Sequence, residues 1–265
     1  MTTAFASAPA ARRPLLRPIA LPSEHGGWGF LFEPIVAAIA IAPSAGGAFI
    51  ALAFVLGFLT RQPLKFALQD ALRGRSYPRT RWCFLFAASY AIAALLALAA
   101  AIAISGPAIL IPLGMVAPLG LMQVFYDANN RSRALLAELG GAVAMTSSAA
   151  ALAVAGRMRL IPALTLAAVL IALGIPSIVY GRTLLQRAHG QHAESWSALA
   201  LHAMAVIIVA LIASPLAAAA MAILFLRATW HLARPALPAK TIGWREIAFG
   251  CATVALIVTG FYLPG

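Results

Sequence analysis

The sequence predicts an all-α fold, a polytopic bundle of about nine transmembrane helices with the N-terminus cytoplasmic and the C-terminus outside. Of the 265 residues, 63% are hydrophobic and only 10% are charged. Soluble domains average about 45–50% apolar and about 25% charged residues. Apolar runs close to the length that crosses a hydrocarbon core recur along the chain. The connections between these runs alternate between short uncharged ones and longer basic ones.

The expected spans, in chain order, are roughly 28–43, 47–60, 84–105, 107–126, 134–156, 160–180, 197–213, 215–230 and 247–263. The second run is short, so its helix is expected to borrow residues from its flanks. The tiny connections at 43–46, 105–107 and 213–215 favour antiparallel neighbours. The chain is therefore expected to form one transmembrane helical domain over 21–265, after a flexible cytoplasmic N-terminus at 1–20.

Basic residues gather on one side of this topology. Of the 19 Lys and Arg residues, all but Arg157 and Arg159 fall on the side of the N-terminus. That side is predicted to be cytoplasmic, because Lys and Arg in short loops stay in the cytoplasm. All five tryptophans lie at the same edge of the spans, as in an aromatic belt. The net charge of +12 therefore indicates topology and attraction to membrane lipids, with no nucleic-acid partner.

The stretch Leu21–Trp28, LPSEHGGW, precedes the first span and carries Glu24 and His25. Part of it recurs before the last span, since ALPSEHGGW at 20–28 and ALPAKTIGW at 236–244 share Ala-Leu-Pro and Gly-Trp. The shared residues suit the approach of a chain to a membrane, because proline restricts the backbone and tryptophan anchors at the headgroups. Glu24 and His25 are absent from the repeat, so they are candidate catalytic residues.

Glu33 is the next candidate and lies inside the first expected span. It follows His25 by eight residues, about 12 Å of helix, and Pro34 is expected to unwind the helix beside it. An ionisable group that faces lipid costs several kcal/mol, so Glu33 is expected to face the bundle interior. Alternatively, Glu33 is protonated or paired with an arginine and only ties helices together.

The segment Thr60–Trp82 is expected to form a basic loop after the second span. Its guanidinium groups present bidentate forks that suit phosphate or diphosphate. The candidate substrate-binding residues here are Arg61, Lys65, Asp70 and Arg75. The alternative is a positively charged loop that lies on anionic lipid headgroups.

A second polar segment runs from Tyr126 to Gly141. Asp127, Arg131 and Glu138 would share one helical face if the fifth helix began early, and Asp127 could instead be a helix cap. Asp127 and Arg131 are candidate binding residues. Glu138 is a second intramembrane carboxylate and a candidate catalytic residue. The small residues that follow it predict a central position for the fifth span.

A third polar segment follows the sixth span and contributes Arg182 and Arg187 as candidate anion-binding residues. His189 and His192 are three residues apart but have no committed third ligand, so no metal site is predicted. His202, inside the seventh span, is interpreted as a hydrogen-bonded core histidine.

These motifs resemble the YwiC-like family of bacterial membrane proteins. The family pattern is Pro-x-Glu-His-Gly-x-Trp near the N-terminus and Arg-x-Pro after the second span, matched here by LPSEHGGW and by RQPL at 61–64. The resemblance covers most of the chain by length and span layout. It implies a multi-pass protein of the bacterial cytoplasmic (inner) membrane and no particular activity.

The layout is more distantly similar to the UbiA superfamily of intramembrane prenyltransferases, whose polar loops follow spans two and six. In that superfamily Asp-rich motifs in both loops hold Mg²⁺ and a prenyl diphosphate. This sequence offers only Asp70 in the first loop and no aspartate in the second. The Mg²⁺ clamp therefore cannot be carried over, the cofactor is unknown, and arginine and lysine would have to hold a diphosphate.

Three functions remain open from the sequence. The first is a divergent UbiA-like transferase or lipid-modifying enzyme acting on an isoprenoid or other anionic lipid, with Glu24, His25, Glu33 or Glu138 as acid, base or carbocation stabiliser. The second is a proton- or cation-coupled transporter that uses the intramembrane carboxylates. The third is a non-catalytic membrane scaffold. We expect the four candidate catalytic residues to converge in one cavity open to the cytoplasmic side, with arginines at its rim.

Overall fold

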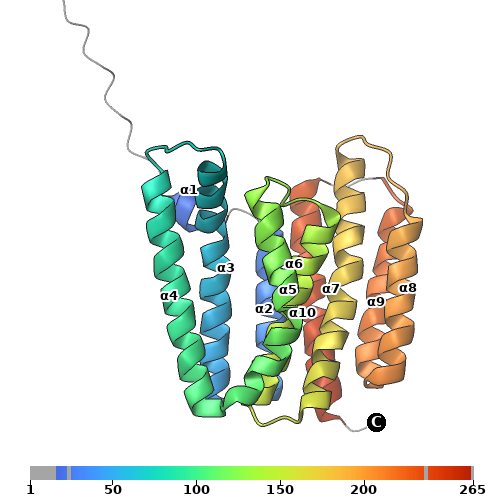
Figure 1. Cartoon of the computed structure of the whole chain (residues 1–265). Helices are drawn as coiled ribbons and strands as arrows, with labels where there is room; N and C mark the ends of the chain where they lie inside the picture. Colours follow the sequence, from blue (N-terminus) through green and yellow to red (C-terminus); the bar gives the residue numbers. More distant parts are fainter. Residues whose placement is uncertain (1–15, 23–24, 236–237, 264–265) are drawn as a thin grey trace, which may run out of the picture.

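The computed structural model is an all-α bundle whose long helices run side by side (Figure 1). It describes residues 16–22, 25–235 and 238–263. The helices are α1 (Arg17–Ala20), α2 (His25–Ile41), α3 (Ala45–Leu72), α4 (Thr80–Ser105), the 3₁₀ turn η1 (Pro107–Ile109), α5 (Leu110–Ala128), α6 (Leu135–Ala155), α7 (Leu160–Ala188), α8 (Trp196–Ile212), α9 (Pro215–Leu232) and α10 (Ala239–Tyr262).

Seven of the described helices are long and apolar enough to cross a membrane: α3, α4, η1 with α5, α6, α7, α9 and α10. Two more apolar helices, α2 and α8, have 17 residues each, about 25 Å of helix at 1.5 Å per residue. Each apolar run expected from the sequence thus corresponds to one helix. The protein is a multi-pass membrane protein.

The outer surface of the bundle is apolar. Leu95 on α4, Leu121 on α5 and Leu211 on α8 are 65%, 71% and 80% exposed. Large exposed leucines on several helices would be costly in water. A hydrocarbon environment removes that cost, so these faces are lipid-facing.

Helix α6 is the centre of the bundle, as its small residues predict. Of its apolar window 56% is buried, against 17% for α4 and for α5. It packs against α2, α3, α5 and α7. Small residues permit this approach: a Cβ at Gly141 would press on the side-chain amide of Gln123 in α5.

Two expected interruptions are absent, so the helices are longer than predicted. Helix α3 continues through Pro63 to Leu72, which places Arg61, Lys65 and Asp70 on a helix and not in a loop. Helix α2 likewise continues through Pro34 without unwinding. Unpaired backbone groups are costly near a membrane, so continuing the helix outweighs the loss of one proline hydrogen bond.

The ends of the bundle differ in charge. The connections after α3, α5, α7 and α9 lie at the end that also carries α1 (Figure 1). We call this the basic end, because its described connections include Arg75, Arg131 and Arg234. The connections after α2, α4, α6 and α8 lie at the opposite end, where Arg157 and Arg159 are found (Figure 1).

Candidate functional site

The residues of the opening motif are only partly visible. Glu24 lies outside the described residues, and so does the side chain of His25, although the α2 backbone begins at His25. Their predicted meeting with Glu33 and Glu138 therefore stays a prediction.

Arg61 is paired across the bundle with Asp127. Its Nε donates to Asp127 Oδ2 at 2.7 Å and its Nη2 to Oδ1 at 3.2 Å. The Gln123 amide donates to the same carboxylate at 3.0 Å, and the Gln69 amide donates to the Asp127 carbonyl at 2.8 Å. A bidentate arginine–carboxylate pair is geometrically specific. These hydrogen bonds connect α3 to α5. They also occupy the Arg61 guanidinium, which was expected to face a substrate.

Asp70 is fully buried and serves the connection between α3 and α4. One carboxylate oxygen accepts from Arg79 Nη2 at 3.1 Å and the other from Thr80 Oγ1 at 2.7 Å. The hydrogen bond that Arg79 donates to Asp70 raises the pKa of the Arg79 guanidinium. Both Asp70 oxygens thus have internal donors, while Lys65 is half-buried on α3 and Arg75 is exposed in the connection.

Asp127, Arg131 and Glu138 do not share a helical face, so that prediction is wrong. Helix α5 ends at Ala128, and Asn130 adopts a left-handed conformation with φ 58°. Asparagine tolerates this conformation and so ends the helix. Arg131 is consequently exposed in the connection, with Asp127 and Glu138 on different helices.

The two predicted arginines of α7 have internal partners. Arg182 Nη1 donates to Glu138 Oε2 at 2.7 Å and to the Arg133 carbonyl at 2.9 Å. Arg187 donates to the Ala193 carbonyl and, at 2.7 Å, to the Leu232 carbonyl. It therefore holds the connection after α7 against the end of α9.

Glu33 faces a neighbouring helix. A Cβ at Gly250 of α10 would collide with Glu33 Oε1, so the carboxyl group rests on the bare backbone of that glycine. Among the described residues, the charged groups that act on it are Glu246 of α10 and Arg227 of α9. Glu138 instead pairs with Arg182. The two intramembrane carboxylates thus have different charged neighbours.

Arg227 is the centre of a buried polar cluster that sequence reasoning missed, because it was counted among the basic residues of the cytoplasmic side. Its side chain is 2% exposed, and its Nη1 donates to Glu246 Oε2 at 2.7 Å. Its guanidinium carbon lies 4.3 Å from the centre of the Tyr180 ring and 5.3 Å from that of Phe249. The available signal was Glu246, one of only seven acids in the chain, directly before the last apolar run.

A hydrogen-bonded pair continues the cluster from Tyr180. The Tyr180 hydroxyl and His231 Nδ1 are 2.7 Å apart, and Arg245 Nη1 lies 3.2 Å from His231 Nε2. Arginine only donates, so His231 Nε2 accepts and the neutral imidazole carries its proton on Nδ1. His231 Nδ1 therefore donates to the Tyr180 oxygen. His202 lies against the same ring, buried and bonded to the Ala198 carbonyl, which confirms its interpretation as a core histidine.

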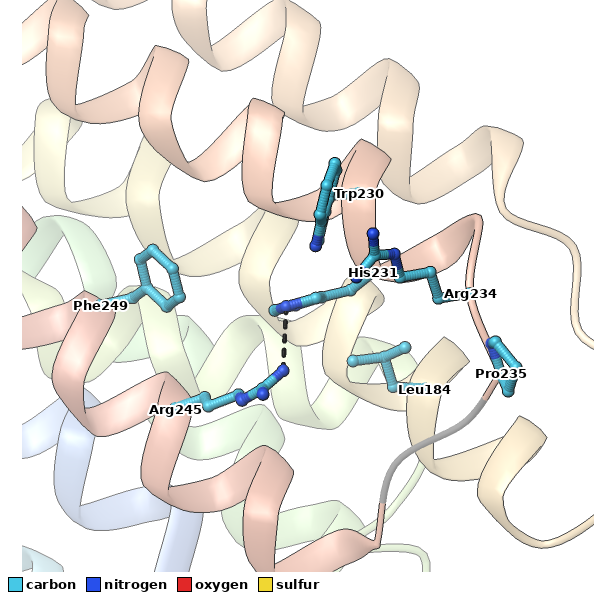
Figure 2. A pocket seen from close by; sticks show the side chains of 7 residues that line it. All are labelled: Leu184, Trp230, His231, Arg234, Pro235, Arg245 and Phe249. Carbon is cyan, nitrogen blue, oxygen red and sulfur yellow. Dashed lines mark hydrogen bonds between the residues drawn. The ribbon is translucent and has the colours of Figure 1, made fainter.

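A cavity of about 360 Å³ adjoins this cluster at the basic end (Figure 2). Its lining residues are Leu184, Trp230, His231, Arg234, Pro235, Arg245 and Phe249. Figure 2 shows Arg245 and His231 joined across it by their hydrogen bond. Arg234 stacks 3.6 Å above the Trp230 ring centre, which holds its guanidinium in place. Within the described residues neither Arg234 nor Arg245 forms a salt bridge, so the cavity wall is cationic and otherwise mostly apolar.

A second cavity of about 410 Å³ lies between α7 and α8 and is lined in part by Arg182, His192 and Glu194. Its arginine is already paired with Glu138, and Glu194 adds a negative charge to the wall. The first cavity is the better anion site. The part of the chain that the structure describes holds no group of three metal-ligating side chains.

The opening motif and the helices that follow it match a known family model. The match is to the YwiC-like protein family and covers residues 21–154, half of the chain. The chain belongs to the YwiC-like family. No curated protein and no solved structure matches it. The matched residues include Glu33 and Glu138, whereas the cavity and Arg227 lie on helices that follow them. The UbiA-like arrangement stays a prediction.

Proposed function

We propose that this YwiC-like protein is a membrane-embedded, lipid-modifying enzyme that acts on an isoprenoid or other anionic lipid. The observation that carries the proposal is the cavity at the basic end. Arg234 and Arg245 supply charged donors, and Trp230, Phe249 and Leu184 supply apolar walls. An anionic headgroup with an apolar tail satisfies both kinds of surface at once.

The headgroup is placed in this cavity because three of the arginines singled out from sequence have other partners, and the other two, Arg75 and Arg131, are exposed in connections. Arg61 engages Asp127, Arg182 engages Glu138, and Arg187 engages backbone carbonyls. Arg234 and Arg245 have no carboxylate partner within the described residues and line a space large enough for a headgroup. Guanidinium groups supply positive charge directly, so the proposal requires no metal to hold the anion.

Proton transfer in the cavity is assigned to His231, which lines it and is hydrogen-bonded to Tyr180. A histidine side chain can take up and release a proton, which suits general acid–base chemistry. The basic end is taken as the cytoplasmic side, in line with the Lys and Arg distribution, and the membrane as the bacterial inner membrane.

Binding is tested with protein purified in detergent, melted with farnesyl diphosphate or with farnesol, which has the same tail and no charge, in the presence of EDTA. Farnesyl diphosphate is expected to raise the melting temperature and farnesol is not. Ligand at 100 times its Kd stabilises the folded state by about 2.7 kcal/mol. Phosphatidic acid replaces farnesyl diphosphate in a parallel series and identifies the preferred tail.

The variants locate the site. Arg234→Gln with Arg245→Gln is expected to abolish the shift, whereas Arg157→Gln with Arg159→Gln makes the same charge change at the opposite end and should retain it. The shift could instead be lost in Arg75→Gln with Arg131→Gln and kept in Arg234→Gln with Arg245→Gln. That result would place the binding site at the residues predicted from the sequence. No shift with either anionic lipid would refute the proposal.

Turnover separates an enzyme from a binding protein. Release of inorganic phosphate or diphosphate from the bound lipid, in the presence of a membrane lipid extract as acceptor, is expected for the wild type and not for His231→Asn. Binding without any product would favour the second candidate, a proton-coupled transporter. The observation behind that candidate is that Glu33 lies between helices beside Arg227 and Glu246. Proton flux into lipid vesicles on addition of farnesyl diphosphate tests it.

A further inference from the structure

Two carboxyl groups and one arginine come together between α2, α9 and α10. Arg227 donates to Glu246 at 2.7 Å, and its side chain is 2% exposed. The Glu33 carboxyl group rests on Gly250, which lies four residues, or about one helical turn, after Glu246 on α10. Helix α10 packs against both α2 and α9, so the three groups belong to one interior site.

The ionisable groups that the structure describes around this site come from several helices. Among them, Glu246 and Arg227 are the charged groups that act on Glu33. The charged groups on the other helices packed against α2 are Glu138 of α6, Arg182 and Arg187 of α7, and Arg61, Lys65 and Asp70 of α3. Beside the cluster, Tyr180 and His231 bond to each other, and His202 of α8 lies on the Tyr180 ring and bonds to the Ala198 carbonyl. Arg245 keeps its charge but is directed to His231 at the cavity wall.

The formal charge of the site is therefore one negative unit if both carboxyl groups are ionised. An uncompensated charge in the membrane interior costs several kcal/mol. Two carboxylates in one site resolve this by keeping one proton between them. The same site with one proton is neutral, with a single guanidinium balancing a single carboxylate.

The hydrogen bonding of the Arg227 guanidinium is also relevant to the charge of the site. Arg227 Nε and Nη2 are buried and have no hydrogen-bond acceptor within the described residues. An ionised Glu33 so near would be expected to draw these spare donors into a second charge-assisted bond. They are not bonded to it, so Arg227 has two donors with which to engage Glu33 when the proton departs.

We propose that Glu33 and Glu246 together hold one proton at neutral pH, and that this pair is a proton-binding site in the interior of the bundle. After deprotonation, Glu33 can accept from the spare donors of Arg227 and so draw the guanidinium away from Glu246. Because Arg227 lies on the Tyr180 ring, whose hydroxyl bonds to His231, such a shift of the guanidinium would act on the cavity wall. The proton site stands whether the cavity serves an enzyme or a transporter.

Infrared spectroscopy of purified protein, without added lipid substrate, tests the proposal. A protonated carboxyl group shows a C=O stretch separate from that of a carboxylate, and it shifts in heavy water. The chain has only seven Asp and Glu residues, so one such band can be assigned. We expect it at pH 7 in the wild type, lost in Glu33→Gln and lost in Glu246→Gln, because either variant leaves one carboxylate for one arginine.

Glu138→Gln is the matched control, since Glu138 has Arg182 to itself, and it should keep the band. Persistence of the band in either Glu33→Gln or Glu246→Gln would overturn the sharing of a proton. Loss of the band in Glu138→Gln would place the proton elsewhere and also overturn it. If the variants fail to fold, the wild type still decides, because absence of a carboxylic acid band at pH 7 refutes the proposal.

Discussion

Replacing Arg227 with methionine tests how much the buried Arg227–Glu246 ion pair contributes to the free energy of unfolding. Methionine keeps much of the apolar volume and removes the charge. Removing one partner of a buried ion pair costs about 3–5 kcal/mol, because the other charge is left uncompensated. The Glu246 side chain keeps 28% exposure, so we expect a loss near the lower end, about 3 kcal/mol of unfolding free energy.

Arg182→Met is the matched comparison. The Arg182–Glu138 pair has the same 2.7 Å distance, but its side chains are 34% and 32% exposed. Exposed pairs contribute about 0–1 kcal/mol, so this variant is expected to cost about 1 kcal/mol or less. Two pairs of equal length should thus differ about threefold in cost, because only one of the two arginines is withdrawn from solvent.

The assay is equilibrium unfolding in mixed micelles of increasing SDS fraction, followed by tryptophan fluorescence and circular dichroism. Adding Glu246→Gln to Arg227→Met should recover at least about 1 kcal/mol, since the two residues are in contact and their effects are not additive. Equal losses for Arg227→Met and Arg182→Met, or no recovery in the double variant, would refute the assigned burial and pairing.

Three further changes have expected outcomes. Gly250→Ala should change the unfolding free energy by about 1 kcal/mol or less, because its Cβ meets the flexible end of Glu33 while alanine gains about 1 kcal/mol of helix propensity; the same change should be more stabilising in a Glu33→Ala background in a melting experiment, and an equal effect in both backgrounds would mean that the two do not touch. Asp70→Ala removes both acceptors of Arg79 and Thr80 and should cost about 1–3 kcal/mol, measured by SDS unfolding; a change below about 0.5 kcal/mol would contradict its structural role. Binding of an anionic lipid in the cavity should weaken as salt rises from 0.05 to about 0.5 M, because the arginine headgroup contacts are partly exposed; salt-independent melting shifts would exclude a charge-based site.

Several features could be predicted from the sequence because they are local. The length and hydrophobicity of each run depend only on consecutive residues, so every expected span has a helix in the structure. Small residues after Glu138 predicted the central position of α6, because they determine how closely neighbours approach. Helix ends were less predictable, since Pro34 and Pro63 are tolerated within continuous helices.

Charge pairing depends on tertiary structure and could not be predicted. Arg61 meets Asp127 across 66 residues, Arg182 meets Glu138 across 44, and Arg227 meets Glu246 across 19. A basic residue near the end of an apolar run looks the same in sequence whether it faces headgroups or the bundle interior.

The sequence by itself thus determined membrane insertion, the helices and the family, because these follow from hydrophobic length and from a short motif. Only the tertiary structure decided which arginines are paired with carboxylates and which line a cavity. Helix packing placed Arg227 between Glu246 and the Tyr180 ring and left Arg234 and Arg245 along a cavity. The physical reason is that the energy of a charge depends on its surroundings, and those surroundings come from helices distant in sequence.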